Sequence, residues 1–325
     1  MSELTYREAV TRALAEELEH DELVMLLGED IGAAGGVFQA TAGLFDRFGE
    51  RRVRDTPIAE QAIVGCALGA AVAGLRPVAE VMFADFAGVC YDQIANQLAK
   101  YRYMSGGQAA VPVTVRMANG GGVGFAAQHS QSVENWFLNV PGLKICVPGT
   151  PADAYGLLKS AIRDDNPVLF FEHKQLYPTR GPVPNEEHLV ELGRAQIVRV
   201  GSDVTVVATQ LMLARAIEAA EQLAGEGVEI ELVDPRTLVP LDLGTILSSV
   251  EKTGKLVCVQ ESPPAGSWGA TIVAAVVESI WDSLDGRPRL VSGDETPIPY
   301  AATLEAAWMP STDRILEALR QAATE

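Results

Sequence analysis

Basic residues are scarce in this chain, which has 25 lysines and arginines against 43 aspartates and glutamates over 325 residues. The formal net charge of -18 opposes binding to phosphate backbones and anionic lipid, so nucleic-acid and membrane-surface roles are disfavoured. A basic protein partner is compatible with such a surface. Long apolar runs are lacking as well, because the longest, residues 63–75, is shorter than the roughly 20 residues that a membrane span requires.

Cysteine is also rare, and no two cysteines form a CxxC pair. The four stand far apart, each in an apolar run: Cys66, Cys90, Cys146 and Cys258. This pattern predicts buried, unpaired thiols in a reducing compartment. The N-terminal residues show no basic segment followed by an apolar one, so no secretory signal is expected. Together these features predict a soluble cytoplasmic protein.

Strand-like apolar runs alternate with amphipathic helical patterns along the first half of the chain. We expect strands at residues 23–27, 78–82, 111–117, 143–147 and 168–172. We expect helices near residues 60–74, 86–103, 132–139 and 152–164. This alternation is typical of an α/β domain with a parallel sheet and helices on both faces.

A proline-rich stretch interrupts the alternation and predicts two domains. Residues 177–187 contain three prolines and no hydrophobic periodicity, which is typical of a linker. After it, strands are expected at 204–208, 228–233 and 256–259, and helices at 211–224, 270–284 and 312–323. We therefore predict one domain over residues 1–189, with the linker at 177–189, and a second α/β domain over 190–325.

A carboxylate opens one of the predicted helices. In the segment Asp55-Thr-Pro-Ile-Ala-Glu60, Pro57 is typical of a helix start, so Glu60 falls in the first turn. A first-turn carboxylate complements the helix dipole without any further role. However, Gly65 and Gly69 follow at positions where each glycine costs about 1 kcal/mol relative to alanine. We expect another backbone to approach the helix closely there.

Two further segments follow predicted strands, where open parallel sheets bind their ligands. Phe83-Ala-Asp-Phe86 offers Phe86 either as a core residue or as a ring-stacking surface. Gln128-His-Ser-Gln131 offers His129 either as a bystander beside a helix cap or as a group for proton transfer near neutral pH. The glycine-rich stretch at residues 119–124 does not fit G-x-G-x-x-G, the pattern of dinucleotide-binding loops, because Phe125 occupies the last position. A dinucleotide site is therefore not expected there.

Several sequence words occur in the order found in one family. Glu60, Gly65 and Gly69 form E-x4-G-x3-G, a pattern of thiamine-diphosphate enzymes. Further words match nearly end to end: Gly28–Gly32, Arg52–Pro57, Gly74–Val78, Asp92–Ile94, Ala99–Gly107, Ala127–Gln131, Pro141–Lys144 and Ile162–Pro167. The chain thus resembles the β subunits of the E1 components of 2-oxo acid dehydrogenases. The resemblance implies an N-terminal pyrimidine-binding domain and a C-terminal domain like that of transketolase.

The resemblance also implies roles for individual residues around thiamine diphosphate. Glu60 is expected to hydrogen-bond the pyrimidine N1′, which promotes the imino form that activates the cofactor. Burial raises a glutamate pKa above its usual value and makes such proton sharing feasible. Phe86 is expected to stack on the pyrimidine ring, and Glu29 and Ile58 to lie beside it. His129 is expected to orient the substrate or the lipoyl group.

The diphosphate half of such a site is missing from this sequence. Related enzymes hold Mg²⁺ through GDG followed by Asn, whereas here Gly293-Asp-Glu295 lacks the second glycine and no Asn follows Asn185. The resemblance therefore implies an α subunit that holds Mg²⁺, with the cofactor at the α–β interface of an α2β2 tetramer. It also implies a structural K⁺ on backbone carbonyls, although an ordinary helix end before Pro167 explains the same residues: Val113, Ala161, Asp164 and Asn166.

The implied reaction is decarboxylation of a 2-oxo acid, followed by acyl transfer to a lipoyl group of E2. The second domain is expected to contact a dimer partner and the subunit-binding domain of E2, without catalytic residues of its own. Pyruvate is the first expectation for the substrate. Residues 82–93 resemble acetoin enzymes, and branched-chain substrates are less favoured. A self-contained transketolase-like enzyme, a non-catalytic subunit and a flavoprotein-like binder are disfavoured, the first because the diphosphate motif is missing.

Overall fold

A computed structural model describes residues 1–325. The chain forms two compact units, one of Met1–Asn119 with Trp136–Leu192 and one of Gly120–Asn135 with Gly193–Glu325. Each unit is built around a sheet of mostly parallel strands, so the predicted α/β class with two parallel-sheet domains is confirmed. Residues 120–135, assigned by the sequence to the first domain, group with the second unit.

The first unit contains parallel strands in the order β6-β7-β5-β4-β2-β3. Their bounds are β2 (Val24–Gly28), β3 (Val53–Asp55), β4 (Arg76–Val81), β5 (Thr114–Asn119), β6 (Lys144–Cys146) and β7 (Val168–His173). β5 and β7 are buried along their whole length, as expected for strands covered on both faces. A separate antiparallel pair joins β1 (Ser2–Thr5) to β8 (Arg180–Val183).

The main helices of the first unit include two that the sequence reading missed, α1 and the short α2. They are α1 (Tyr6–His20), α2 (Leu44–Phe48), α3 (Glu60–Val72), α4 (Ala99–Met104) and α5 (Pro151–Arg163). Helix α1 begins with a capping box, in which Thr5 and Glu8 bond each other's backbone N–H groups. It packs along α5. Such a box can be recognised in a sequence, because Thr and Glu stand three residues apart.

Two predicted helices differ from the structure. The helix expected near residues 86–103 consists of three pieces, the 3₁₀ turn η1 (Ala84–Gly88), the π-helical η2 (Gln93–Leu98) and α4. The helix expected at 132–139 is only a 3₁₀ turn, η3 (Glu134–Phe137). A further short turn, η4 (Lys174–Leu176), follows β7.

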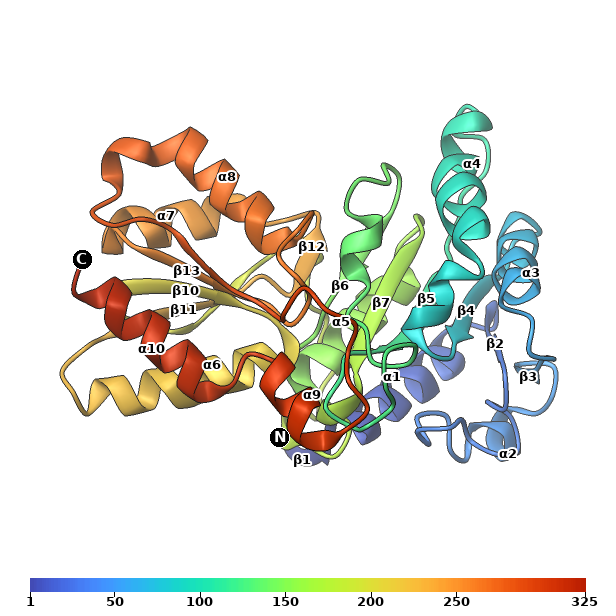
Figure 1. Ribbon diagram of the computed structural model, residues 1–325. Coiled ribbons are helices and arrows are strands. Elements are labelled where there is room, and N and C mark those ends of the chain that lie inside the picture. Colours follow the sequence, from blue (N-terminus) through green and yellow to red (C-terminus); the bar gives the residue numbers. More distant parts are fainter. The chain divides into compact units, whose positions relative to one another are not determined.

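The second unit has a five-stranded sheet in the order β14-β13-β10-β11-β9, in which only β9 is antiparallel to its neighbour. The strands of this sheet are β9 (Gln196–Arg199), β10 (Val204–Ala208), β11 (Ile230–Asp234), β13 (Leu256–Val259) and β14 (Arg289–Val291). The unit also contains the short strand β12 (Thr237–Val239), which lies outside this sheet. Its helices are α6 (Gln210–Ala224), α7 (Leu243–Thr253), α8 (Trp268–Ile280), α9 (Ala302–Trp308) and α10 (Thr312–Ala323), with the turn η5 (Trp281–Ser283). Helices α6 and α10 cover one face of this sheet, and α7 and α8 cover the other (Figure 1).

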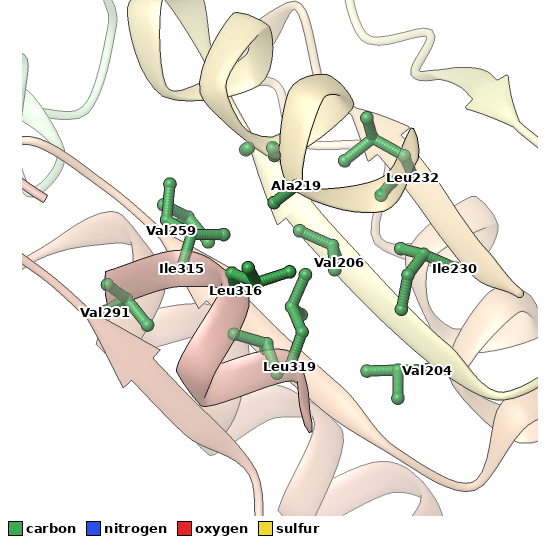
Figure 2. Close-up of a cluster of buried hydrophobic side chains, with 14 of the residues drawn as sticks. Val204, Val206, Ala219, Ile230, Leu232, Val259, Val291, Ile315, Leu316 and Leu319 are labelled. Carbon is green, nitrogen blue, oxygen red and sulfur yellow. The ribbon is translucent and has the colours of Figure 1, made fainter. Parts of the chain in front are cut away.

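The core beneath α6 and α10 shows why this unit is stable. Val206 and Leu232 of the sheet and Ile315 and Leu319 of α10 are fully buried together (Figure 2). Burying one such side chain contributes about 1.5–3 kcal/mol relative to leaving it exposed. Neither unit contains a helix with the length and apolar character needed to cross a membrane.

Candidate cofactor site at the strand ends of the first unit

Two sequence words meet where β2 and β3 end. The strands are in parallel register, with Gly28 opposite Asp55. The backbone N–H of Thr56 donates to the Gly28 carbonyl at 2.9 Å. The backbone N–H of Gly32 donates to Asp55 Oδ1 at 2.6 Å. These bonds fasten the loop that contains Glu29 to the segment that leads into α3.

The close contact with Asp55 explains why residue 32 is a glycine. A Cβ at Gly32 would lie 2.4 Å from Asp55 Oδ2, well inside the distance of a normal contact. Any larger residue must therefore push Asp55 away or move the loop. The glycine allows the carboxylate of Asp55 to hold the loop by its backbone.

Glu60 is the first residue of α3, and its side chain is half-buried. Burial, followed by the charges of Asp30 and Glu60, raises the pKa of Glu29 above its ordinary value. Burial and the charge of Glu60 together raise the pKa of the Cys90 thiol to about 12. Both effects require Glu60 to lie close to the Glu29 loop and to the segment after η1. The structure therefore brings Glu29 and Glu60 close together, and their roles beside a cofactor stay predictions.

Phe86 and Ile58 give this edge an apolar surface. Phe86 is half-buried in η1, directly after β4, and Ile58 is 73% exposed just before α3. Between β3 and Ile58, the Oγ1 atom of Thr56 is buried without a hydrogen-bond partner. A partly exposed aromatic ring, an exposed isoleucine and an unsatisfied hydroxyl suit a ligand that combines a flat ring with polar atoms.

The α3 glycines do not behave as predicted within this chain. A Cβ at Gly65 would lie 3.5 Å from Gln93 Oε1, and a Cβ at Gly69 would meet nothing within 4 Å. The expected close approach of another backbone is therefore wrong within the chain. The prediction for Cys66 is also wrong, because this thiol on α3 is exposed, whereas the other three cysteines are buried.

A buried ion cluster lies among the central strands and was missed in the sequence reading. Arg116 of β5 bonds Glu80 of β4 at 2.6 Å and Glu172 of β7 at 2.7 and 2.9 Å. The Tyr177 hydroxyl donates to Glu172 at 3.0 Å. Burial raises the pKa of Glu80, although the Arg116 guanidinium acts in the opposite direction. The available signal was one charged residue within each of the predicted strands 78–82, 111–117 and 168–172.

His129 belongs to the second unit, in the loop that follows β5. Its side chain is half-buried, and its backbone N–H donates to the Ala126 carbonyl at 3.4 Å. Gly120 N–H donates to the Gln131 carbonyl at 3.2 Å, so the two ends of the loop are joined. Two carboxylates that the sequence reading missed, Glu261 and Glu305, also accept hydrogen bonds from this loop.

The residues predicted to hold K⁺ gather around one turn. The Val113 carbonyl accepts from Val168 N–H at 2.9 Å, and the Ala161 carbonyl accepts from Asp164 N–H at 3.3 Å. The Asp164 carbonyl accepts from Arg76 at 3.3 Å, and Asn166 Oδ1 accepts from Arg102 at 2.8 Å. Lys144 pairs with the Asp164 carboxylate. Three cationic side chains thus surround the turn at which a potassium ion was expected.

Comparisons with known proteins agree with this architecture. The pyrimidine-binding domain model of transketolase matches residues 2–180, and the transketolase C-terminal domain model matches residues 193–315. A solved structure described as a split-gene transketolase, an inactive β4 tetramer, superposes with a TM-score of 0.80 at 25% identity. That match covers 99% of this chain and 98% of the other. The chain therefore has the two domains of transketolase-type enzymes.

Relatives that match over nearly their full length define the family of this chain more closely. The 2-oxoisovalerate dehydrogenase β subunit of Bacillus subtilis is 45% identical, with 99% of each chain covered. The β subunit of acetoin:2,6-dichlorophenolindophenol oxidoreductase from Cupriavidus necator is 46% identical, covering 98% of this chain and 97% of that one. The pyruvate dehydrogenase E1 β subunit of B. subtilis is 42% identical, with 99% of each covered. The chain belongs to the family of E1 β subunits of 2-oxo acid dehydrogenases, as its sequence words predicted.

Proposed function

We propose that this chain supplies the pyrimidine half of a thiamine-diphosphate site, with Glu60 as the carboxyl group that bonds the pyrimidine N1′. The observation that carries the proposal is the position of Glu60. It begins α3 at the carboxyl edge of a parallel sheet, is half-buried, and interacts electrostatically with Glu29 and Cys90. A carboxyl group that is partly shielded from solvent at such an edge can hydrogen-bond a nitrogen of a bound ring. Glu60 therefore lies where it could bond a ring nitrogen of the cofactor.

The other residues at this edge have complementary tasks in the proposal. Phe86 offers its ring face for stacking, and Ile58 offers an exposed apolar side chain. Thr56 Oγ1, which is buried without a partner, is available to a polar ligand atom. Glu29, whose own pKa is raised by burial and by the charges of Asp30 and Glu60, borders the same edge. When bound, thiamine diphosphate supplies a thiazolium ring that accepts the electrons released as a 2-oxo acid loses carbon dioxide.

A second polypeptide completes this site in the proposal. The sequence lacks a GDG motif, and no group of three acidic, histidine or cysteine residues in the chain is arranged to hold a metal ion. Mg²⁺ prefers oxygen ligands and binds through carboxylates together with substrate phosphates. We assign its protein ligands to an α subunit, in an α2β2 tetramer. His129 then orients the substrate or the lipoyl group of E2, whose subunit-binding domain docks on the acidic surface of this chain.

The relatives define the family of this chain but do not agree on a single substrate. The full-length relatives are named for 2-oxoisovalerate, acetoin and pyruvate. Pyruvate remains our first proposal, with acetoin second and a branched-chain 2-oxo acid third. A cytoplasmic location and a K⁺ ion at the Ala161–Asn166 turn also remain proposals. The cations around this turn compete with K⁺, and thermal unfolding in potassium and in sodium salts would test whether the ion binds.

One experiment tests the proposal as a whole. The chain is co-expressed with an α subunit, supplied with thiamine diphosphate and Mg²⁺, and assayed for carbon dioxide release from pyruvate and 3-methyl-2-oxobutanoate and for acetoin oxidation. We expect activity only in the tetramer, and activity with one substrate well above the others. Activity of the chain alone would refute the half-site. Full activity of the Glu60→Gln tetramer would remove the role assigned to Glu60.

A further inference from the structure

We infer that Glu261 and Glu305 are positioning residues that hold the His129 loop in its active shape. This inference rests on the proposed role of His129. Both glutamates come from the part of the chain after the linker, which the sequence resemblance assigned to dimer contact and E2 docking alone. The hydrogen bonds around residues 120–135 give this part a second task, the organisation of the loop that contains His129.

The two carboxylates accept four hydrogen bonds from the loop. Gly121 N–H donates to Glu261 Oε1 at 2.6 Å, and the Ser132 hydroxyl donates to the same oxygen at 3.1 Å. Gly122 N–H donates to Glu305 Oε1 at 2.7 Å, and Gly124 N–H donates to Oε2 at 3.1 Å. Hydrogen bonds to an ionised acceptor are about twice as strong as neutral ones. Residues on both sides of His129 are therefore held.

Burial makes these bonds important for both carboxylates. Glu261 is 6% exposed and Glu305 is 3% exposed. A buried carboxylate is strongly disfavoured unless hydrogen bonds replace its hydration. Here the replacement comes mainly from backbone N–H groups of the glycine-rich stretch. The loop and the carboxylates therefore stabilise each other, and neither is expected to keep its conformation when the other is removed.

The glycines of this loop have their explanation in the same contact. Gly122 has a φ of 84° and Gly124 a φ of 74°, in the left-handed region that favours glycine. This conformation lets N–H groups close together in sequence converge on one acceptor, as in anion-binding turns. The stretch that failed the dinucleotide pattern is thus an anion-binding loop whose anion is a side chain of the same unit.

A second fastening lies at the end of the loop. The Asn135 side chain donates to Ser262 Oγ at 2.6 Å and accepts from Trp268 N–H at 3.0 Å. Ser262 directly follows Glu261, and Trp268 begins α8. Glu261 and Ser262, just after β13, therefore hold both the start and the end of the loop, and Glu305 of α9 holds its start. His129 lies between these anchors, five residues after Gly124 and three before Ser132.

The test uses the α2β2 tetramer with Glu305→Ala, Glu305→Gln, Glu261→Gln and, as a matched control, the exposed Glu251→Gln of α7. Hydrogen exchange of the loop amides is measured in each tetramer. Losing charge-assisted bonds should raise exchange of residues 121–124 about ten- to a hundredfold in Glu305→Ala. We expect a smaller rise in Glu305→Gln, which keeps an acceptor, and none in Glu251→Gln. Unchanged exchange in Glu305→Ala would overturn the inference.

Kinetics separate loop positioning from a general loss of structure. We expect Glu305→Ala to lower kcat for acyl transfer to lipoyl-E2 while cofactor binding by the tetramer stays unchanged, with partial recovery in Glu305→Gln. Equal losses in cofactor binding and kcat would indicate general unfolding and contradict the inference. His129→Ala distinguishes the two proposals. If His129→Ala is fully active, the role of His129 fails, whereas a rise of loop exchange in Glu305→Ala would still establish the clamp.

Discussion

Two pairs of glutamates in this chain lie in contrasting surroundings. In the first unit, Glu29 and Glu60 lie near each other at the carboxyl edge of the sheet, and their mutual repulsion helps raise the pKa of Glu29. In the second unit, Glu261 and Glu305 are buried and accept hydrogen bonds from backbone N–H groups. The first pair lies at a strand edge with few hydrogen-bond donors, whereas the second pair is held by backbone donors of the loop.

The difference teaches how one side-chain type supports both chemistry and structure. A carboxyl group that lacks strong donors retains the capacity to bind a proton or a ligand nitrogen, which catalysis requires. A carboxylate surrounded by N–H donors loses that capacity and becomes a structural acceptor. Glu80 and Glu172 form a third case, in which a single arginine is shared between two buried carboxylates. The four predictions below test these assignments.

The largest effect is expected for Glu60→Gln. Glutamine keeps the shape of the side chain but cannot share a proton with a ring nitrogen, and general acid–base contributions are typically about 10²- to 10⁴-fold in rate. We therefore expect a loss of that size in kcat of the assembled tetramer, measured as carbon dioxide release. The exposed Glu50→Gln of the same unit serves as the control and should be fully active. Equal activity of the two variants would contradict the distinction between the glutamate pairs.

The next largest effect is on stability and concerns Arg116→Met. The substitution leaves Glu80 and Glu172 buried without their shared cation, and breaking a buried pair in this way typically costs about 3–5 kcal/mol. Urea unfolding should show a loss of this size. The control is Arg199→Met, which removes a pair with the exposed Glu229. Such surface pairs are worth about 0–1 kcal/mol. Similar losses in both variants would show that the buried cluster has no special weight.

These assignments also show how far the sequence alone could lead. The place of Glu60 in the first turn of a helix was predictable from Pro57 and the periodic run that follows. The roles of Glu60 and Phe86 came from the family resemblance and stay predictions. Glu261 and Glu305 were not predictable, because their partners are backbone N–H groups more than 100 positions earlier in the chain. A side chain that bonds backbone leaves no complementary residue type to search for.

Some predictions of secondary-structure elements were wrong for similar physical reasons. The strands with continuous apolar runs were predicted because burial on both faces gives a strong signal. The expected helix at 132–139 became a 3₁₀ turn, in a segment where Asn135 bonds Ser262 and Trp268 rather than its own helix. The segment 86–103 has helical periodicity, but its turns change from 3₁₀ to π to α form, and spacing alone does not distinguish these.

A moderate effect is expected for Gly32→Ala, which tests the framework that brings Glu29 and Glu60 together. The new Cβ would lie 2.4 Å from the Asp55 carboxylate and displace the acceptor of the Gly32 N–H. Overpacking of this kind typically costs about 1–3 kcal/mol, which urea unfolding would measure. Gly69→Ala is the matched control, because its Cβ has open space and helix propensity favours alanine by about 1 kcal/mol. A stabilised Gly32→Ala variant would contradict the proposed contact.

The smallest effect is expected for Glu29→Gln, and it depends on pH. The folded chain holds the Glu29 proton more tightly than the unfolded chain, because its folded pKa is raised above the ordinary 4.5. Stability is therefore lost as pH rises from the ordinary pKa through the raised one. Glutamine removes this loss, so the variant should gain under about 1 kcal/mol at neutral pH after allowance for solvent screening. The gain in stability should vanish well below pH 4.5, where the side chain at position 29 is neutral in both the parent and the variant.

Urea unfolding of the isolated chain at several pH values would measure this difference, with the exposed Glu22→Gln as the control. A gap that stays constant with pH, or that reverses its sign, would mean that Glu29 does not experience the charge of Glu60. The argument that Glu29 and Glu60 lie close together would then lose its support, even if Glu60→Gln were inactive. A gap that opens between acidic and neutral pH, and closes when Glu60 is also replaced by glutamine, would attribute the effect to that pair.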